Sequence, residues 1–340
     1  MRADFHFNGV ALFESVDYLT HGGASHSVGA TRCGGESCAG DTMKILISGA
    51  SGLVGTSLAR VLRREGHTVG RLVRPGGRLD PGDVAWDPMS ASVDMARMEG
   101  TDAFVHLSGS SIGDGRWTPT RKAALRSSRV DSTRVLVDAT TRLKRRPKVF
   151  VCASAIGYYG DRGDEILTES SEPGMDFLAL LARDWEAEAM RAEQGGIRTV
   201  RPRYGVILSA AGGALPQMVT PFKLGIGGRF GSGRQWMSWV TLEDAIEITR
   251  AAVTDQRYSG PINVVAPNPV RNNEFVRVLA HMLHRPAIFP APAFALRLAL
   301  GEMADPLLLF SQRVRPERLL AMNYAFRTDD LGSALSAALS

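Results

Sequence analysis

The spacing Gly49-x-x-Gly52-x-x-Gly55 is the feature of this chain that points most directly to chemistry. In such a turn the first glycine permits a tight strand-to-helix connection, the second lets a ligand approach the backbone, and the third allows close helix packing. Free N–H groups at the N-terminus of the following helix favour an anion such as a pyrophosphate. A tight turn without a ligand would show the same spacing, but the flanking strands and helix favour a dinucleotide. The predicted cofactor-binding residues of this turn are Gly49, Ser51, Gly52, Leu53, Val54 and Gly55.

Arg74 ends the predicted strand 68–73 and lies 25 residues after Gly49. An acidic residue at this position would accept hydrogen bonds from the ribose 2′-hydroxyl, whereas an arginine suits a 2′-phosphate. The alternative is an ordinary solvated arginine at a strand end. We expect Arg74 to select NADP(H).

Ser154 and Tyr158 lie in the segment Ser-Ala-Ile-Gly-Tyr-Tyr-Gly, which directly follows a predicted strand over 148–153. A serine hydroxyl can hold a substrate oxygen and a tyrosine can act as a general acid. Because tyrosine titrates near pH 10, it needs a neighbouring cation to exchange protons at neutral pH. None of the six tyrosines has a lysine four residues later, so Arg162 is the candidate cation for Tyr158. The alternative for Tyr158 and Tyr159 is aromatic packing beside the cofactor.

Alternating strands and helices predict an α/β fold of the Rossmann type, with a doubly wound, mostly parallel sheet. Loops at the carboxyl ends of such strands line the ligand crevice. Leu107, Ser108 and Gly109, at the end of the predicted strand 103–107, are therefore candidate cofactor contacts. His106 lies inside that strand, where a packed side chain is favoured over a catalytic base. The predicted strands span 44–47, 68–73, 84–86, 103–107, 148–153, 197–203 and 261–265, and predicted helices span 56–65, part of 117–143, 175–193, 243–253, 273–283 and 293–310.

Composition excludes several classes of protein. The net charge of +5 comes from scattered arginines, with no basic and aromatic pattern typical of nucleic-acid binding. No run of 18 apolar residues predicts a membrane span. The three cysteines form no CxxC pair, which fits a reducing cytosol, and no metal site is predicted. Residues 1–42 lack periodicity and an apolar face, so we expect a non-core extension and a native start at Met43.

Several segments together resemble the epimerase-like branch of the extended short-chain dehydrogenases/reductases, often labelled NAD-dependent epimerase/dehydratase or cell-division-inhibitor-like. The resemblance covers residues 43–339 and rests on the 49–55 turn, 154–165, Trp185-Glu186, 222–225 and 231–235. It implies that Ser128-Arg129 reaches the cofactor, an exposed helical arginine being the alternative for Arg129. It also implies a cofactor domain over 43–210, to which 238–268 returns, and a smaller substrate-side lobe over 211–237 and 269–340, with a C-terminal domain of uncertain role.

The chain departs from this family in two places. The Tyr-x-x-x-Lys pair of the superfamily is absent, and the helix that would carry it reads Phe-Leu-Ala-Leu-Leu-Ala-Arg-Asp-Trp-Glu over 177–186. Asn323 stands where the family usually has glycine, and asparagine is the next-best residue for a left-handed backbone.

Three functions follow from the resemblance. The chain could be an NADP(H)-dependent oxidoreductase or epimerase that uses Ser154 and Tyr158 on an unidentified small molecule. It could instead be a non-catalytic NADPH-binding regulator. A strict nucleotide-sugar epimerase is disfavoured, because no sugar-binding signature is evident over 235–239, where the tryptophans form either an apolar substrate wall or core.

Overall fold

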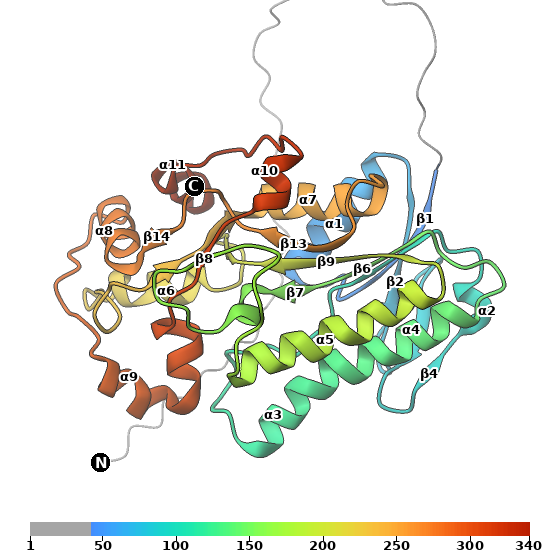
Figure 1. Cartoon of the computed structure of the whole chain (residues 1–340), viewed down its shortest axis with the longest axis horizontal. Helices are drawn as coiled ribbons and strands as arrows, with labels where there is room; N and C mark the ends of the chain where they lie inside the picture. Colours follow the sequence, from blue (N-terminus) through green and yellow to red (C-terminus); the bar gives the residue numbers. More distant parts are fainter. Residues whose placement is uncertain (1–41) are drawn as a thin grey trace, which may run out of the picture. The chain divides into compact units, whose positions relative to one another are not determined.

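The computed structural model describes residues 42–340, so the predicted N-terminal extension lies almost entirely outside the described residues. A nine-stranded sheet forms the centre of this part of the chain (Figure 1). Its strands run in the order β13-β9-β6-β5-β1-β2-β3-β4, with β7 also pairing with β9, and only the β3–β4 pair is antiparallel. Their bounds are β1 (Lys44–Ser48), β2 (Thr68–Val73), β3 (Val84–Asp87), β4 (Ser92–Val93), β5 (Ala103–His106), β6 (Val149–Cys152), β7 (Ser154–Ala155), β9 (Arg198–Tyr204) and β13 (Gly260–Val264).

Helices cover both faces of the sheet, as the predicted doubly wound fold requires (Figure 1). On one face α1 and α7 pack on Ile45 and Ile47 of β1, and on the other α4 and α5 belong to the core that contains Leu46. Successive side chains of a strand point to opposite faces, so a strand buried on both sides is apolar throughout. The helices are α1 (Leu53–Arg64), α2 (Met95–Met98), α3 (Pro119–Arg126), α4 (Ser132–Arg142), α5 (Phe177–Gln194) and α7 (Leu242–Thr254). The α/β Rossmann-type prediction is confirmed.

The long helix predicted within 117–143 is interrupted. A π-helical segment, η1 (Ser127–Asp131), joins α3 to α4 and contains Arg129. Asn323 has φ +56°, which confirms the left-handed backbone expected at that position. The continuous helix predicted over 293–310 is wrong: α9 (Ala293–Leu300) ends at Gly301, whose φ of +67° breaks the helix before a further turn begins.

A smaller group of elements packs around its own core beside the main sheet. Phe222, Trp239, Phe275 and Leu279 are the large side chains of that core. Its helices are α6 (Leu215–Lys223), α8 (Asn272–Met282) and α11 (Leu331–Leu339). Two further helices, α9 and α10 (Glu317–Ala321), lie between α8 and α11 in the chain. Three strand pairs connect this part of the chain: β8 (Ile166–Leu167) with β15 (Arg313–Val314), β10 (Val206–Leu208) with β12 (Trp239–Thr241), and β11 (Trp236–Met237) with β14 (Val270–Arg271). The helix α6 was not predicted, because Pro216 and Pro221 obscure its pattern.

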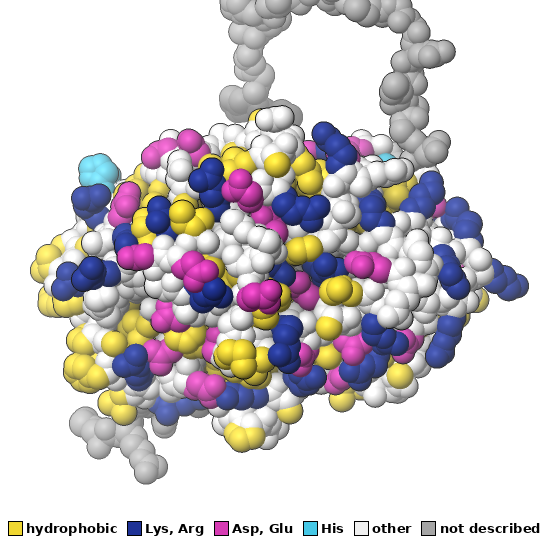
Figure 2. All heavy atoms as spheres, viewed as in Figure 1, with side chains coloured by type: hydrophobic (Ala, Val, Ile, Leu, Met, Phe, Trp, Pro, Cys, Tyr) yellow, Lys and Arg dark blue, Asp and Glu magenta, His cyan; other side chains and the backbone are white. Residues whose placement is uncertain are grey.

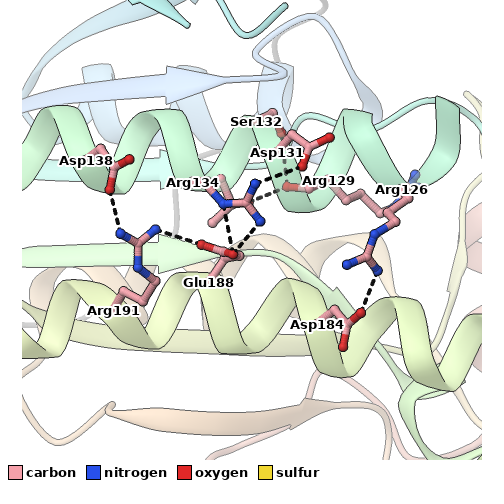
Figure 3. Close-up of polar contacts among 10 residues, drawn as sticks. Arg126, Arg129, Asp131, Ser132, Arg134, Asp138, Asp184, Glu188 and Arg191 are labelled. Carbon is pink, nitrogen blue, oxygen red and sulfur yellow. Dashed lines mark hydrogen bonds and ion pairs between the residues drawn. The ribbon is translucent and has the colours of Figure 1, made fainter. Parts of the chain in front are cut away.

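Ion pairs join α4 to α5 along their exposed faces (Figure 3). Glu188 lies at the centre and accepts hydrogen bonds from Arg134 at 2.7 Å and from Arg191 at 2.8 Å. Arg191 also reaches Asp138 of α4 at 2.8 Å. Burial opposes ionisation of Glu188, but the two arginines outweigh it and hold the pKa of this carboxyl below its usual value. A network of this kind stabilises more than an isolated surface pair.

We expect Glu188→Gln to lower the free energy of unfolding by about 1 kcal/mol at pH 7. Since the folded-state pKa is lowered, this contribution is present above the unfolded pKa of about 4.3 and is lost as the pH falls through the folded pKa. Urea denaturation at pH 7 and pH 3 measures the difference. Glu172→Gln, at an exposed glutamate without an ion pair among the described residues, is the control. A difference that persists unchanged at pH 3 would assign the loss to packing.

Candidate functional site

The glycine turn has the geometry of a ligand cradle. Gly49 has φ +70°, and a Cβ there would lie 2.8 Å from the backbone of Leu107. A Cβ on Gly55 would lie 2.3 Å from the Gly49 carbonyl oxygen. The turn closes through a 3.0 Å hydrogen bond from Gly52 N to Gly49 O. A side chain is therefore excluded at Gly49 by the backbone after β5, and at Gly55 by the backbone of the turn itself.

Helix α1 begins directly over this turn without a side-chain cap. Gly52 is the N-cap residue and supplies no side-chain hydrogen bond, so the first N–H groups of the helix, including those of Leu53 and Val54, have no capping side chain. Ser51 is exposed at the tip of the turn. Free N–H groups and the helix dipole both favour an anionic group at this point.

Arg74 lies beside the turn. Parallel pairing sets Ser48 of β1 opposite Leu72 of β2, which brings the chain just beyond β2 to the level of the turn after β1. The Arg74 side chain is exposed and makes no hydrogen bond or ion pair with a described residue. A free guanidinium at this position fits a phosphate that the turn would hold nearby.

The loop after β5 completes this edge of the crevice. Leu107 N donates to Ser48 O at 3.1 Å, which keeps Leu107 and Ser108 against Gly49. Arg129 lies behind Gly109, where a Cβ would be 3.0 Å from the Arg129 guanidinium carbon. The structure therefore brings together the turn, the 107–109 loop and Arg129 at the carboxyl ends of neighbouring parallel strands.

Arg129 is partly buried and has no carboxylate partner among the described residues. Its guanidinium donates to Ser110 O at 3.0 Å and lies 5.4 Å from the centre of the Trp185 ring. Burial, together with the charge of Arg121, lowers the pKa of Arg129 to about 10, so it remains charged at neutral pH. Arg121 Nε is itself buried and has no hydrogen-bond partner. Two uncompensated arginines beside the loop fit an anionic ligand, and Arg121 was missed because the sequence places it on an ordinary basic helix.

His106 is not a catalytic base. Its ring is fully buried, with Nδ1 2.5 Å from Ser48 Oγ and Nε2 3.3 Å from Ser132 Oγ. Burial, with a smaller effect from Arg129, lowers the pKa of His106 to about 3. The imidazole is therefore neutral at pH 7, which confirms the packed histidine predicted from the sequence.

Ser154 belongs to a buried ionic network that the sequence did not predict. Its hydroxyl donates to Glu186 Oε1 at 2.7 Å. Arg203 donates to both oxygens of the same carboxylate, through Nε at 2.7 Å and Nη2 at 2.8 Å. Ser154, Glu186 and Arg203 are each at least 94% buried. The Ser154 hydroxyl has no further proton to donate and can only accept a hydrogen bond. It could therefore hold a substrate hydroxyl, which donates, but not a substrate carbonyl oxygen.

Tyr158 lies face-on against the guanidinium of Arg203, with the Arg203 Cζ atom 3.5 Å from the ring centre. Arg162, the cation predicted for this tyrosine, instead pairs with Glu165 at 2.7 Å, so that prediction is wrong. A loop arginine four residues on need not return to the same side chain, because only a helix places such residues on one face. Burial raises the pKa of Tyr158, although Arg203 acts in the opposite direction. The phenol is therefore protonated at neutral pH.

Tyr159 points into the core. Its hydroxyl donates to Asn263 Oδ1 at 2.6 Å and accepts from Arg203 Nη1 at 2.9 Å. Burial raises the pKa of Tyr159 to about 12. For Tyr159 the packing alternative is therefore correct, whereas Tyr158 is only half-buried.

A cavity of about 60 Å³ lies beside this segment, and no charged side chain lines it. Ile156, Trp236 and Phe310 contribute to its walls. Trp239 is 1% exposed and belongs to the core, as one of the two alternatives for residues 235–239 predicts, whereas Trp236 lines the cavity. The substrate wall stays a prediction. The remaining lining residues are Val206, Met218, Phe230, Met237, Ser238, Pro306, Leu307, Leu308 and Gln312.

Within residues 42–340, the His, Cys, Asp and Glu side chains form no group of three that could hold a metal ion. Every helix in the same range is too short or too polar to cross a bilayer.

Comparison with known proteins agrees with this geometry. The model of the NAD dependent epimerase/dehydratase family matches residues 45–265, and a domain of unknown function (DUF1731) matches residues 291–338. The chain is 39% identical to "Epimerase family protein YfhF" of Bacillus subtilis, covering 86% of this chain and 97% of that protein. It is 34% identical to "Epimerase family protein SDR39U1" of Homo sapiens, covering 86% of this chain and 98% of that protein.

Solved structures of relatives share the fold. Human epimerase family protein SDR39U1 (isoform 2), crystallised with NADPH, matches with a TM-score of 0.79 at 33% identity, over 87% of this chain and 99% of that chain. A nucleoside-diphosphate sugar epimerase from Corynebacterium glutamicum matches with a TM-score of 0.73 at 38% identity, over 88% of this chain and 59% of that chain. With a Rossmann-type fold, a glycine turn that fits a dinucleotide and relatives that it matches over almost their full length, this chain belongs to the NAD-dependent epimerase/dehydratase family of extended short-chain dehydrogenases/reductases.

Proposed function

We propose that this protein is an NADP(H)-dependent oxidoreductase that acts on a small, largely apolar carbonyl compound or alcohol. One observation carries the proposal: Tyr158, partly exposed and protonated, stacks on a charged Arg203 at the same edge of the sheet as the 49–55 turn. The apolar lining of the adjacent cavity supports a substrate without a charged diphosphate. An epimerase would use the same groups on a substrate that is oxidised and reduced in turn.

The roles of the chain's own residues follow from their positions. Bound NADP(H) would supply or accept the hydride. The turn and the 107–109 loop would hold the dinucleotide, Arg74 its 2′-phosphate, and Arg129 a further polar group. Tyr158 would donate a proton to the substrate oxygen, and Arg203, fixed by Glu186, would stabilise negative charge that develops on the phenol.

Arg74→Ala should weaken NADPH binding about 10- to 150-fold, because a charge-assisted hydrogen bond to phosphate contributes about 1.5–3 kcal/mol. The affinity for NADH should hardly change. Calorimetric titration of both cofactors measures the selectivity. Arg78→Ala, another exposed arginine of the same loop, is the matched control. Tighter binding of NADH than of NADPH by the parent protein would overturn the choice of cofactor.

A specific observation favours a second candidate, a non-catalytic NADPH-binding regulator. Helix α5 contains no tyrosine and no lysine, and Leu178 faces Gly157 where it packs on the 156–159 segment. The regulator would bind NADPH tightly and leave it unoxidised across a broad panel of aldehydes and ketones. Turnover of any member of the panel that depends on Tyr158 would exclude it.

A further inference from the structure

We propose that the smaller lobe holds a second ligand site, which binds a small amphipathic anion: an apolar body that ends in a carboxylate or phosphate. The site is a cleft of about 600 Å³. Its polar residues are Arg229, Asn273 and Arg277, and its apolar residues are Val276, Ala280, Ala287, Ile288 and Pro290. The proposal goes beyond the NADP(H)-dependent function and does not depend on it.

Main-chain contacts build one wall of this cleft. The segment 227–231 runs beside 289–291, with hydrogen bonds from Phe289 N to Gly227 O at 3.3 Å and from Ala291 N to Arg229 O at 2.8 Å. Gly228 lies so close that a Cβ there would be 1.9 Å from the Phe289 carbonyl oxygen. Helix α8 forms the opposite wall through Val276 and Ala280, which are buried. Hence the cleft is part of the folded lobe.

The cleft is separate from the predicted substrate site. The two cavities share no lining residue. Arg229 lines the large cleft, whereas its neighbour Phe230 lines the small cavity near Tyr158. Adjacent side chains of an extended segment point to opposite sides, so this segment forms a partition between the two. A ligand in one cavity would leave the other free.

The charged side chains of the cleft favour a negatively charged ligand. No carboxylate lines it, and neither Arg229 nor Arg277 forms a side-chain hydrogen bond or ion pair with a described residue. Many other arginines of the described chain are paired, such as Arg271 with Asp164 at 2.8 Å. Two free guanidinium groups over an apolar floor suit an anionic head group and a hydrocarbon body. The volume lies within the range of about 300–1,000 Å³ usual for small-molecule sites.

Apolar side chains surround the cleft on the protein surface. Figure 2 shows hydrophobic side chains gathered on the side of the molecule that carries α8 and α9. Ile288 is 69% exposed and Phe289 is 54% exposed. These side chains would shield the hydrocarbon body of a bound ligand from water.

Calorimetric titration of the full chain with four probes of equal chain length tests the proposal. The probes are decanoate, decyl phosphate, decanol and decyltrimethylammonium, each kept below its micelle concentration. Saturable binding is expected for one or both anions, with the tighter one identifying the head group, and much weaker binding for the other two probes. Arg229→Gln and Arg277→Gln should each weaken anion binding about tenfold or more. Arg60→Gln, at an exposed and unpaired arginine of α1, should leave it unchanged.

A second pair of variants keeps the test independent of the arginines. Ile288→Glu places a carboxylate in the lining at an exposed position, so it should abolish anion binding, whereas Ile288→Leu should preserve it. Unchanged NADPH affinity in every variant would show that the fold and the cofactor site are intact. The proposal is overturned if neither anion binds saturably, if decanol binds as tightly as the anions, or if the arginine variants bind like the parent.

Discussion

Replacing Arg203 by methionine should lower the free energy of unfolding by about 3–5 kcal/mol, the usual cost of breaking a buried ion pair by removing one partner. Arg203 is 3% exposed and Glu186 is 6% exposed, so the carboxylate of Glu186 would lose both guanidinium hydrogen bonds without gaining water. Of its cationic partners it would keep only Arg201, whose Nε lies 3.6 Å from Oε2 and is too distant for a hydrogen bond. Although burial opposes the charged form, Glu186 holds the pKa of Arg203 above its usual value. Urea denaturation at pH 7 measures the loss.

Two controls separate the ionic contribution from packing. Replacing both partners, Arg203→Met with Glu186→Leu, also removes the buried carboxylate, while Arg201 keeps its ion pair with Glu193 at 2.9 Å. The double variant should therefore be more stable than Arg203→Met alone. Arg257→Met breaks an equally close but exposed pair with Asp255 and should leave the unfolding midpoint nearly unchanged. A double variant less stable than the single one would assign the loss to shape.

The cofactor half of the site could be predicted from sequence because its information is local. Gly49, Gly52 and Gly55 lie within seven residues, and a backbone contact inside or next to the turn excludes a side chain at Gly49 and at Gly55. Parallel pairing then brings Arg74 and Gly109 to the same edge of the sheet, since the carboxyl ends of neighbouring strands meet there. The left-handed backbone at Asn323 was predictable for the same local reason.

The buried ionic network beside Tyr158 could not be predicted, because its contacts are tertiary. Ser154, Glu186 and Arg203 come from β7, α5 and β9, and no spacing in the sequence relates them. A signal was nevertheless present: β9 is an inner strand of the sheet but carries arginines at 198, 201 and 203. Charged residues in such a strand need buried partners, and the search for those partners would have pointed to Glu186.

The cleft in the smaller lobe could not be predicted from the sequence either. Arg229 and Arg277 are 48 residues apart and resemble any other arginine of this basic chain. Contacts between the loop that carries Arg229 and the start of α8, such as the 2.9 Å hydrogen bond from Phe230 N to Asn272 Oδ1, bring the two arginines to one cavity. The structure distinguishes these two unpaired arginines from the many that form ion pairs, and the sequence cannot make that distinction.

Tyr158→Phe should lower kcat by about 10²- to 10⁴-fold for any carbonyl substrate that the parent protein reduces with NADPH, since it removes the proton donor. The NADPH dissociation constant should not change, because the phenol lies outside the 49–55 turn and the Arg74 region. Tyr159→Phe is the matched control: it removes the hydroxyl bonded to Asn263 and should reduce stability while it leaves kcat near that of the parent.

The pH dependence distinguishes an acid from a base. Burial raises the pKa of Tyr158 above its ordinary value of 10, so the protonated phenol that donates in reduction persists up to and beyond pH 10. Reductive turnover should therefore stay level across the neutral range and fall only as the phenol ionises at higher pH, whereas a tyrosinate base would make the rate rise towards alkaline pH. A stopped-flow measurement of NADPH oxidation between pH 6 and 10.5, run on the parent and on Tyr158→Phe, records the profile. If Tyr158→Phe retains full turnover with an unchanged profile, the proton comes from another group, and the stacking of Tyr158 on Arg203 serves only to stabilise the fold.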